Sequence, residues 1–337
     1  MTELRWGLLA AGTIAAEFAA GVEESKHGVL TAVAARSGDR AREFATRFEI
    51  PKAYGGYEDL LADPDVDAVY VSTPHPMHAE WAIRAAEAGK HVLCEKPLTV
   101  TAEDAEEVIT AARKHDVFLM EAFMYRLHPQ TRRLVSLISS GAIGEVRAVE
   151  VKFSYSGTSE VERLGDPALG GGGILDVGCY CTSLARLVAQ AALGVDVVEP
   201  TEVSGMARLS ASGVDEFATG LLRLPGDILA TLSCGFRLGQ EDGIRVYGSR
   251  GQLHVPRPAW IHPLRKPGTS QIVLTPTDGA PEVIEVEATQ GIFAREADYV
   301  ASHIEDRQAP EVTWAETLAN MRTLDRWRAA VGYGRPS

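Results

Sequence analysis

Short apolar runs alternate with amphipathic stretches through the first third of the chain. The predicted strands are Leu4–Leu9, Val29–Ala35, Ala68–Ser72, His91–Cys94 and Val117–Glu121. The helical patterns between them are Ile14–Ala20, Arg40–Phe48, Met77–Ala88 and Ala102–His115. Strands that are apolar at nearly every position and separated by helices are typical of a parallel sheet covered on both faces. The alternation therefore predicts an α/β domain with a mostly parallel, doubly wound sheet over residues 1–123.

The patterning changes after residue 123. Longer strands with alternating polar and apolar residues are predicted at Glu145–Tyr155, Glu216–Leu224, Ile228–Gly235, Gly243–Tyr247 and Gln252–Val255. Helices are predicted at Gln130–Ser140, Ile174–Leu193, Phe293–Ile304 and Trp314–Ala329. A chain of 337 residues is long enough for two domains. We therefore predict that residues 124–337 form an α+β domain with a large, mainly antiparallel sheet and C-terminal helices.

Charge and composition argue against several classes of protein. The net charge is −13, and broad nucleic-acid binding needs a basic surface, so we expect no nucleic-acid partner. No apolar run approaches the roughly 18 residues of a membrane span, and no signal-peptide pattern follows Met1. The four cysteines lack the spacing of a zinc site. We therefore expect no bound metal, no membrane association, reduced thiols and a cytoplasmic location.

The turn after the first predicted strand reads Ala10-Ala11-Gly12-Thr13-Ile14-Ala15. It occupies the place of the glycine-rich fingerprint of Rossmann dinucleotide-binding domains, with alanine where the first glycine usually lies. Glycine at the second position lets a pyrophosphate approach backbone N–H groups at a helix N-terminus. A positive φ at the first position would strain alanine. The predicted phosphate contacts are Ala11, Gly12, Thr13 and Ile14.

The end of the second predicted strand indicates which dinucleotide is bound. NAD-specific sites usually place a carboxylate there, about 20 residues beyond the fingerprint, on the ribose 2′-hydroxyl. This chain instead has Arg36-Ser37, followed by Arg40. Guanidinium and hydroxyl groups suit the additional 2′-phosphate of NADP. We therefore predict NADP as the cofactor, in preference to NAD, with these three residues at its phosphate.

Several motifs together resemble the glucose–fructose oxidoreductase/inositol dehydrogenase (Gfo/Idh/MocA) family over nearly the whole chain. They are Glu95-Lys96-Pro97, Ser72-Thr73-Pro74 with His78, Met120–Arg126, the glycine-rich stretch Gly171–Tyr180, and Met321–Asp325. The resemblance implies that Lys96 is the catalytic lysine and that its bond to Pro97 is a candidate cis peptide. Asp176 and Tyr180 match the family's second motif. In having a tyrosine at position 180, the chain resembles the dihydrodiol dehydrogenase, xylose dehydrogenase and glucose–fructose oxidoreductase branches of the family.

Elementary chemistry suggests roles for Lys96, Asp176 and Tyr180. Oxidising an alcohol requires a proton acceptor while hydride leaves carbon. A free tyrosine has a pKa near ~10 and needs a neighbouring cation to act near neutral pH. We assign Tyr180 as the proton donor or acceptor and Lys96 as its electrostatic partner, although these two roles can be reversed. Asp176, on the same helix face by its i, i+4 spacing, would orient substrate or lysine.

Further residues are expected at the edges of the site. In open α/β sheets, ligands bind beyond the carboxyl ends of the strands. The predicted cofactor contacts there are Ser72, Thr73, Pro74, His78, Glu95 and Lys96. The candidates for holding substrate are Lys96, Arg126, His128, Asp176 and Tyr180, of which Arg126 and His128 can instead be structural. Phe153 and Tyr155 alternate on a strand and are expected to pack on the sheet.

The predicted function is hydride transfer between NADP(H) and a CH–OH or C=O group of a sugar, polyol or trans-dihydrodiol. An aldose or a trans-dihydrodiol is favoured as substrate. One alternative is a ketoreductase acting on a nucleotide-linked keto-sugar. Another is a non-catalytic NADP-binding regulatory protein, which the presence of Lys96, Asp176 and Tyr180 disfavours. By analogy with the family, we also expect a homo-oligomer, either a dimer or a tetramer.

Overall fold

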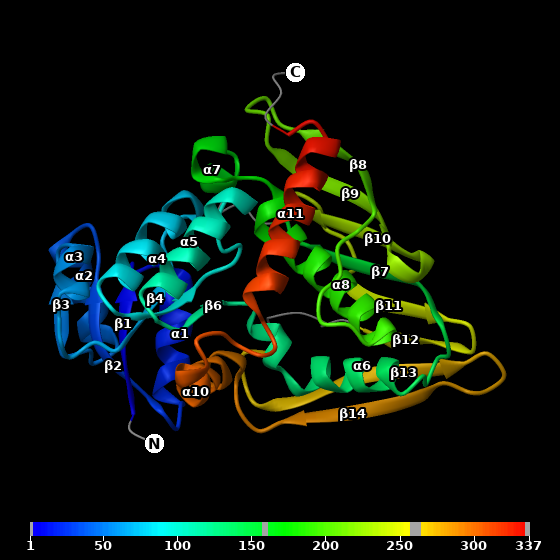
Figure 1. Cartoon of the computed structure of the whole chain (residues 1–337), viewed down its shortest axis with the longest axis horizontal. Coiled ribbons are helices and arrows are strands. Elements are labelled where there is room, and N and C mark those ends of the chain that lie inside the picture. Colours follow the sequence, from blue (N-terminus) through cyan, green and yellow to red (C-terminus); the bar gives the residue numbers. More distant parts are fainter. Residues whose placement is uncertain (1–2, 157–160, 257–263, 334–337) are drawn as a thin grey trace. The chain divides into compact units, whose positions relative to one another are not determined.

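The computed structural model describes residues 3–156, 161–256 and 264–333 (Figure 1). Its contacts divide the chain into two units. Unit 1 contains Met1–Leu127 and Gln290–Thr317, and unit 2 contains His128–Thr289 and Leu318–Ser337. We predicted a boundary after residue 123 and a second domain that continues to residue 337. The segment Gln290–Thr317 instead groups with unit 1.

A helix–helix contact explains this grouping. In unit 1, α10 (Ile292–His303) packs against α1 (Thr13–Glu23). A Cβ atom placed on Gly21 of α1 would lie only 2.4 Å from Cβ of Phe293. The two helices can approach this closely because glycine has no side chain. The sequence of α10 predicts a helix but does not indicate which element it covers.

Unit 1 is built on a six-stranded parallel sheet with the order β3-β2-β1-β4-β5-β6. Its strands are β1 (Leu4–Leu9), β2 (Gly28–Ala34), β3 (Lys52–Tyr54), β4 (Ala68–Val71), β5 (His91–Cys94) and β6 (Leu119–Glu121). The strand order reverses between β1 and β4, which is where open α/β sheets bind ligands. The predicted doubly wound α/β class is confirmed.

Helices cover the parallel sheet. They are α1, α2 (Gly38–Arg47), α3 (Tyr57–Leu61), α4 (His78–Glu87), α5 (Ala102–Lys114) and α10. Leu8 and Leu9 are adjacent on β1, and both are fully buried. Successive side chains of a strand point to opposite faces, so both faces of the sheet are covered. Neither β3 nor α3 was predicted, because three to five residues carry too little periodicity.

Unit 2 contains an eight-stranded sheet with the order β14-β13-β12-β11-β7-β10-β9-β8. Its strands are β7 (Val146–Ser154), β8 (Glu202–Leu209), β9 (Asp215–Leu224), β10 (Ile228–Gly235), β11 (Gly243–Gly248), β12 (Gly251–Val255), β13 (Gly268–Pro276) and β14 (Glu282–Ala288). The pair β7/β10 is parallel, and the other pairs are antiparallel. The predicted large, mainly antiparallel sheet is confirmed.

Two helices lie on one face of this sheet (Figure 1): α6 (Pro129–Ser139) against β13 and β14, and α8 (Cys179–Leu193) against β7 and β10. On α11 (Trp314–Ala330), Trp327 is fully buried, and a Cβ atom placed on Gly220 would lie 2.7 Å from its ring. Met206 and Leu221, on β8 and β9, are exposed to 84% and 53%.

In the described residues, no helix combines the length and apolar character needed to cross a bilayer.

Candidate active site

The turn between β1 and α1 is open to a ligand. Gly12 is the N-cap residue of α1, and as a glycine it makes no side-chain capping hydrogen bond. A Cβ atom placed on Gly12 would meet no heavy atom within 4 Å, so nothing obstructs a phosphate that approaches the helix N-terminus. Ala10 has a φ of 92°. The position usually held by the first glycine therefore adopts the left-handed conformation that strains alanine.

Basic and hydroxyl groups gather where β2 leads into α2. Ser37 is the N-cap residue of α2, but its side chain makes no capping hydrogen bond. Arg36 and Arg40 are exposed. Both are close to Tyr57: burial raises the pKa of Tyr57, and the charges of the two arginines oppose this rise. Within the described residues, no carboxylate forms an ion pair with either arginine, so both guanidinium groups are available to an anion.

The loop after β4 contains an unsatisfied hydroxyl group. Ser72 Oγ donates a hydrogen bond to the carbonyl oxygen of Leu9 at 3.1 Å, which ties this loop to the end of β1. Thr73 Oγ1 is buried and has no hydrogen-bond partner among the described residues. A buried polar atom without a partner costs about 1–3 kcal/mol. A polar ligand atom beside Thr73 would therefore be stabilised.

His78 joins this loop to the loop after β5. Its Nδ1 lies 2.9 Å from the carbonyl oxygen of Pro97, and its Nε2 lies 2.8 Å from that of Thr73. Burial lowers the pKa of His78 to about 4, and the two carbonyl contacts only partly oppose this. The neutral ring donates to one of the two carbonyl groups. We predicted that His78 contacts the cofactor, whereas both ring nitrogens face main-chain oxygens.

The loop after β5 carries Lys96. The Lys96–Pro97 peptide bond is cis, as the resemblance implied. The backbone N–H of Lys96 donates to Oε2 of Glu95 at 3.1 Å, and the hydroxyl of Tyr70 donates to Oε1. Glu95 is 5% exposed. Its carboxylate therefore anchors the loop from inside unit 1, although we predicted that it contacts the cofactor.

Two residues that support this loop were missed by the sequence analysis. Tyr70 is a fully buried residue of β4, and only its hydrogen bond distinguishes it from the apolar residues around it. Glu121 ends β6, and its Oε1 accepts the N–H of Leu98 at 2.8 Å. Glu121 could have been identified from the sequence, because it places a carboxylate at the end of an otherwise apolar strand. The signal for Tyr70 lies only in the tertiary structure.

The two other predicted substrate contacts make internal bonds. Arg126 Nη2 donates to the carbonyl oxygen of Glu311 at 2.8 Å, and Nη1 lies 3.5 Å from Oε2 of Glu316; all three belong to unit 1. In unit 2, His128 Nδ1 accepts the N–H of Gln130 at 3.1 Å and so caps α6. Both side chains are buried. These contacts favour the structural role that the sequence left open.

Two side chains of unit 2 hold Asp176. The phenol of Tyr155 donates to its Oδ2 at 2.5 Å, and Nη2 of Arg163 lies 3.3 Å from its Oδ1. Tyr155 directly follows β7, and Arg163 lies on α7 (Val161–Leu164). We expected Tyr155 to pack on the sheet and did not single out Arg163. Tyr155 does pack, against the buried cluster of Leu164, Val214 and Phe236. Both residues also bind the predicted catalytic carboxylate, in contacts that its charge strengthens.

A change of helix type separates Asp176 from Tyr180. Asp176 lies in a π-helical turn (Ile174–Gly178), and Tyr180 lies in the first turn of α8. We predicted one α-helix with an i, i+4 pair, whereas the turn that contains Asp176 is π-helical. Tyr180 is fully buried, and its ring meets that of Phe153 edge-on at a centroid distance of 5.3 Å. Single π turns occur frequently at functional sites.

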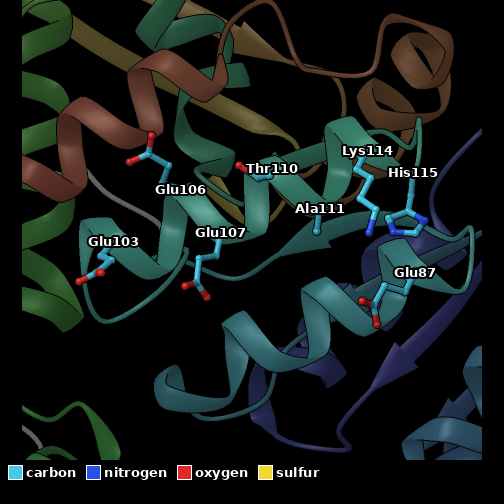
Figure 2. A pocket seen from close by; sticks show the side chains of 8 residues that line it. All are labelled: Glu87, Glu103, Glu106, Glu107, Thr110, Ala111, Lys114 and His115. Carbon is cyan, nitrogen blue, oxygen red and sulfur yellow. The ribbon is translucent and has the colours of Figure 1, made fainter.

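A shallow hollow of about 380 Å³ lies between α4 and α5 of unit 1 (Figure 2). Its lining residues are Glu87, Glu103, Glu106, Glu107, Thr110, Ala111, Lys114 and His115. None of the predicted site residues lines it. The hollow is open and predominantly acidic, so it does not suit the phosphates of a dinucleotide.

The features of unit 1 define a class of protein. The strand order of the parallel sheet, the open turn at Gly12 and the basic cluster after β2 together form a Rossmann-type dinucleotide-binding domain. Residues 4–123 match a family model described as "Oxidoreductase family, NAD-binding Rossmann fold". Residues 131–254 match the Gfo/Idh/MocA C-terminal domain. The chain therefore belongs to the Gfo/Idh/MocA family of oxidoreductases, as its motifs implied.

Relatives extend this match over nearly the whole chain. The trans-1,2-dihydrobenzene-1,2-diol dehydrogenase of Bos taurus is 33% identical and covers 99% of this chain and 98% of its own. The enzyme of the same name from Homo sapiens is 36% identical over 76% of this chain and 75% of its own. A solved structure of KijD10, a 3-ketoreductase from Actinomadura kijaniata in complex with TDP-benzene and NADP, is 29% identical. It has a TM-score of 0.85 and covers 98% of both chains.

Proposed function

We propose that this chain is an NADP(H)-dependent dehydrogenase that oxidises a CH–OH group of a trans-dihydrodiol. The observation that carries the proposal is the match over 99% of the chain to a relative named trans-1,2-dihydrobenzene-1,2-diol dehydrogenase. An aldose is the next substrate class. It is supported by the solved aldose–aldose oxidoreductase of Caulobacter crescentus, which is 25% identical with a TM-score of 0.85 over 99% of this chain.

The residues of unit 1 fit NADP. Gly12 leaves the N-terminus of α1 accessible to the pyrophosphate. The hydroxyl of Thr73, which has no hydrogen-bond partner among the described residues, offers a hydrogen bond. Arg36, Ser37 and Arg40 would hold the 2′-phosphate, because no carboxylate occupies the end of β2. The related ketoreductase was solved with NADP. When bound, the nicotinamide accepts or supplies the hydride.

Lys96, Tyr180 and Asp176 would carry the chemistry. In this proposal, the phenolate form of Tyr180 takes the proton of the hydroxyl group that is oxidised and becomes the neutral phenol. The Lys96 ammonium group supplies the positive charge that stabilises the developing alkoxide, and Asp176 accepts a hydrogen bond from a substrate hydroxyl. Solved mutants of the related ketoreductase replace a lysine and a tyrosine that are separated by the same number of positions as Lys96 and Tyr180 here.

The proposal is tested by turnover. The purified protein is mixed with NADP⁺ and trans-1,2-dihydrobenzene-1,2-diol, or with D-xylose, and the nicotinamide absorbance is followed. We expect NADPH formation with the diol, and a loss of at least about 100-fold in kcat in the Tyr180→Phe variant with NADPH binding retained. Tyr247→Phe, the same change on β11 of the same unit, is the matched control. NADPH binding without turnover of either substrate would overturn the proposal.

A second candidate function is reduction of a nucleotide-linked keto-sugar. It is favoured by the match of the 3-ketoreductase structure over 98% of this chain. The reaction is the reverse hydride transfer, so Tyr180 would donate the proton that it accepts during oxidation. Oxidation of NADPH by a TDP-linked 3-keto-sugar, at a kcat/KM above that of the dihydrodiol, would select this function.

The outer face of the eight-stranded sheet supports a homo-oligomer. Met206, Leu221 and Leu229 are at least half exposed and lie on the neighbouring strands β8, β9 and β10. Apolar side chains gathered on one face are typical of an interaction surface. We expect light scattering at micromolar concentration to show a dimer or tetramer, and a monomer would contradict this. All four cysteines are buried thiols, which supports a reducing, cytoplasmic location.

A further inference from the structure

A carboxylate from a distant strand holds the glycine run that precedes Asp176. Asp215 is the first residue of β9, and its side chain is fully buried. Its Oδ2 accepts the N–H of Ile174 at 2.7 Å. The π-helical turn begins at Ile174, and its N-cap residue Gly173 makes no side-chain capping hydrogen bond. Asp215 therefore serves as an N-cap supplied from another element.

The same contact requires glycine in the turn. Gly172 has a φ of 104°, and a Cβ atom placed on it would lie 2.3 Å from Oδ1 of Asp215. A Cβ atom on Gly173 would lie 2.9 Å from Cα of Gly235. The N–H groups of Gly171 and Gly172 donate hydrogen bonds to main-chain carbonyl oxygens. The first N–H group of the turn thus depends on the carboxylate, and the glycines allow it to come close.

We propose that Asp215 is a positioning residue, which holds the start of the π-helical turn and thereby sets the positions of Asp176 and Tyr180. This inference rests on the proposed function, in which those two residues act on the substrate. Asp176 lies within the capped turn, and Tyr180 follows directly on α8. A displacement of about 1 Å in a catalytic group can lower a rate by about 100-fold. Loosening the cap should therefore lower turnover and leave cofactor binding to unit 1 unchanged.

Asp215 also changes its charge near neutral pH. Burial raises the pKa of Asp215 to about 7, and its N–H contacts and the charge of Arg328 only partly oppose this. Two other titratable groups face the carboxylate. Burial raises the pKa of Tyr333 and raises that of Cys234 well above its ordinary value. Asp215 is therefore the group of this cluster that titrates between pH ~6 and ~8.

Ionisation of Asp215 has opposite effects on the cap and on stability. A carboxylate makes stronger hydrogen bonds to N–H groups than a carboxylic acid does, so the cap tightens as pH rises through about 7. The pKa of Asp215 is higher in the folded than in the unfolded chain, so its contribution to stability falls as pH rises from about 4 to about 7. A residue with a purely structural role would change turnover and stability in the same direction.

Hydrogen exchange tests the cap without a substrate. Exchange of the peptide spanning residues 171–180 is measured by mass spectrometry about one unit below and one unit above pH 7, with correction for the intrinsic rate. We expect protection in the wild type to rise about tenfold with pH, and protection in Asp215→Asn to stay constant. Glu216→Gln, the next residue of β9, is the matched control, because its carboxylate pairs with Arg208 and Arg237 instead. Wild-type protection that does not change with pH would overturn the cap, whether or not the variant folds.

Kinetics with NADP⁺ and trans-1,2-dihydrobenzene-1,2-diol test the positioning role. We expect Asp215→Asn to lower kcat about tenfold above pH ~7, to keep the KM for NADP⁺ within about twofold and to lose the inflection near pH 7. A wild-type kcat and pH profile in Asp215→Asn would overturn the positioning role. Absence of turnover in the wild type would overturn the proposed function, while hydrogen exchange would still decide whether Asp215 holds the turn.

Discussion

The phenol of Tyr155 donates a hydrogen bond to Oδ2 of Asp176 at 2.5 Å. Arg163 approaches the other carboxylate oxygen at 3.3 Å. The end of β7, the short helix α7 and the π-helical turn therefore meet at one carboxylate within unit 2. Asp176 is thus the centre of a network and not an isolated acid on a helix.

Removing the phenol tests this network. A hydrogen bond to a charged group contributes roughly 1.5–3 kcal/mol, so we expect Tyr155→Phe to lower kcat/KM for the dihydrodiol by about 10- to 100-fold. In an Asp176→Asn background, the same change should have little further effect, because its partner is no longer charged. Steady-state kinetics of the double-mutant cycle checks this. Additive effects of the two substitutions would show that the residues act independently.

The basic cluster after β2 predicts cofactor selectivity. Each of Arg36→Ala and Arg40→Ala should raise the KM for NADP⁺ by about tenfold or more, since each removes a charge-assisted contact to the 2′-phosphate. The KM for NAD⁺, which lacks this phosphate, should not change. Arg42→Ala, on the same helix, is the control because Arg42 pairs with Asp39. An equal rise in the KM for NADP⁺ and for NAD⁺ would show that Arg36 and Arg40 do not bind the 2′-phosphate.

The positive φ of Ala10 predicts a stabilising substitution. Strain at such a position costs roughly 1–3 kcal/mol, whereas glycine loses about 0.4–1 kcal/mol more entropy on folding. Ala10→Gly should therefore raise the free energy of unfolding by about 1 kcal/mol, measured by urea denaturation. Ala20→Gly, inside α1, should lower it by a similar amount. A destabilised Ala10→Gly variant would show that alanine is unstrained there.

The buried imidazole of His78 predicts a pH dependence of stability. Burial lowers its pKa to about 4, whereas an unfolded histidine titrates near ~6.5. As pH falls from about 6.5 to about 4, the unfolded chain gains a proton that the folded chain does not, so His78 costs roughly 2–4 kcal/mol of stability.

The difference in unfolding free energy between the wild type and His78→Gln isolates this effect. Asp215 acts in the opposite sense over an overlapping range, so the wild type alone is not informative. We expect any deficit of the variant at pH ~7 to shrink or reverse near pH ~4.5. His115→Gln, at the partly exposed residue after α5, is the control. If the unfolding free energies of the wild type and His78→Gln differ by the same amount at pH ~7 and pH ~4.5, the buried, neutral state of His78 is contradicted.

Much of the fold could be predicted from local pattern. The strands Leu4–Leu9 and His91–Cys94 have the predicted bounds, because short apolar runs between helices carry a clear signal. The helix expected at Ile174–Leu193 is observed, but its first turn is π-helical. Periodicity cannot distinguish a single π turn from an α turn, because both continue the same apolar face.

The sequence by itself determined the alternation of strands and helices in unit 1, the basic end of β2 and the presence of Lys96, Asp176 and Tyr180 in family motifs. These signals are local, since they depend on residues that are neighbours along the chain. Only the tertiary structure decided that Tyr155 and Arg163 bind Asp176, that Asp215 caps its turn, and that α10 packs on α1. Sheet register and helix packing create these contacts between residues that are up to hundreds of positions apart, and no short pattern specifies them.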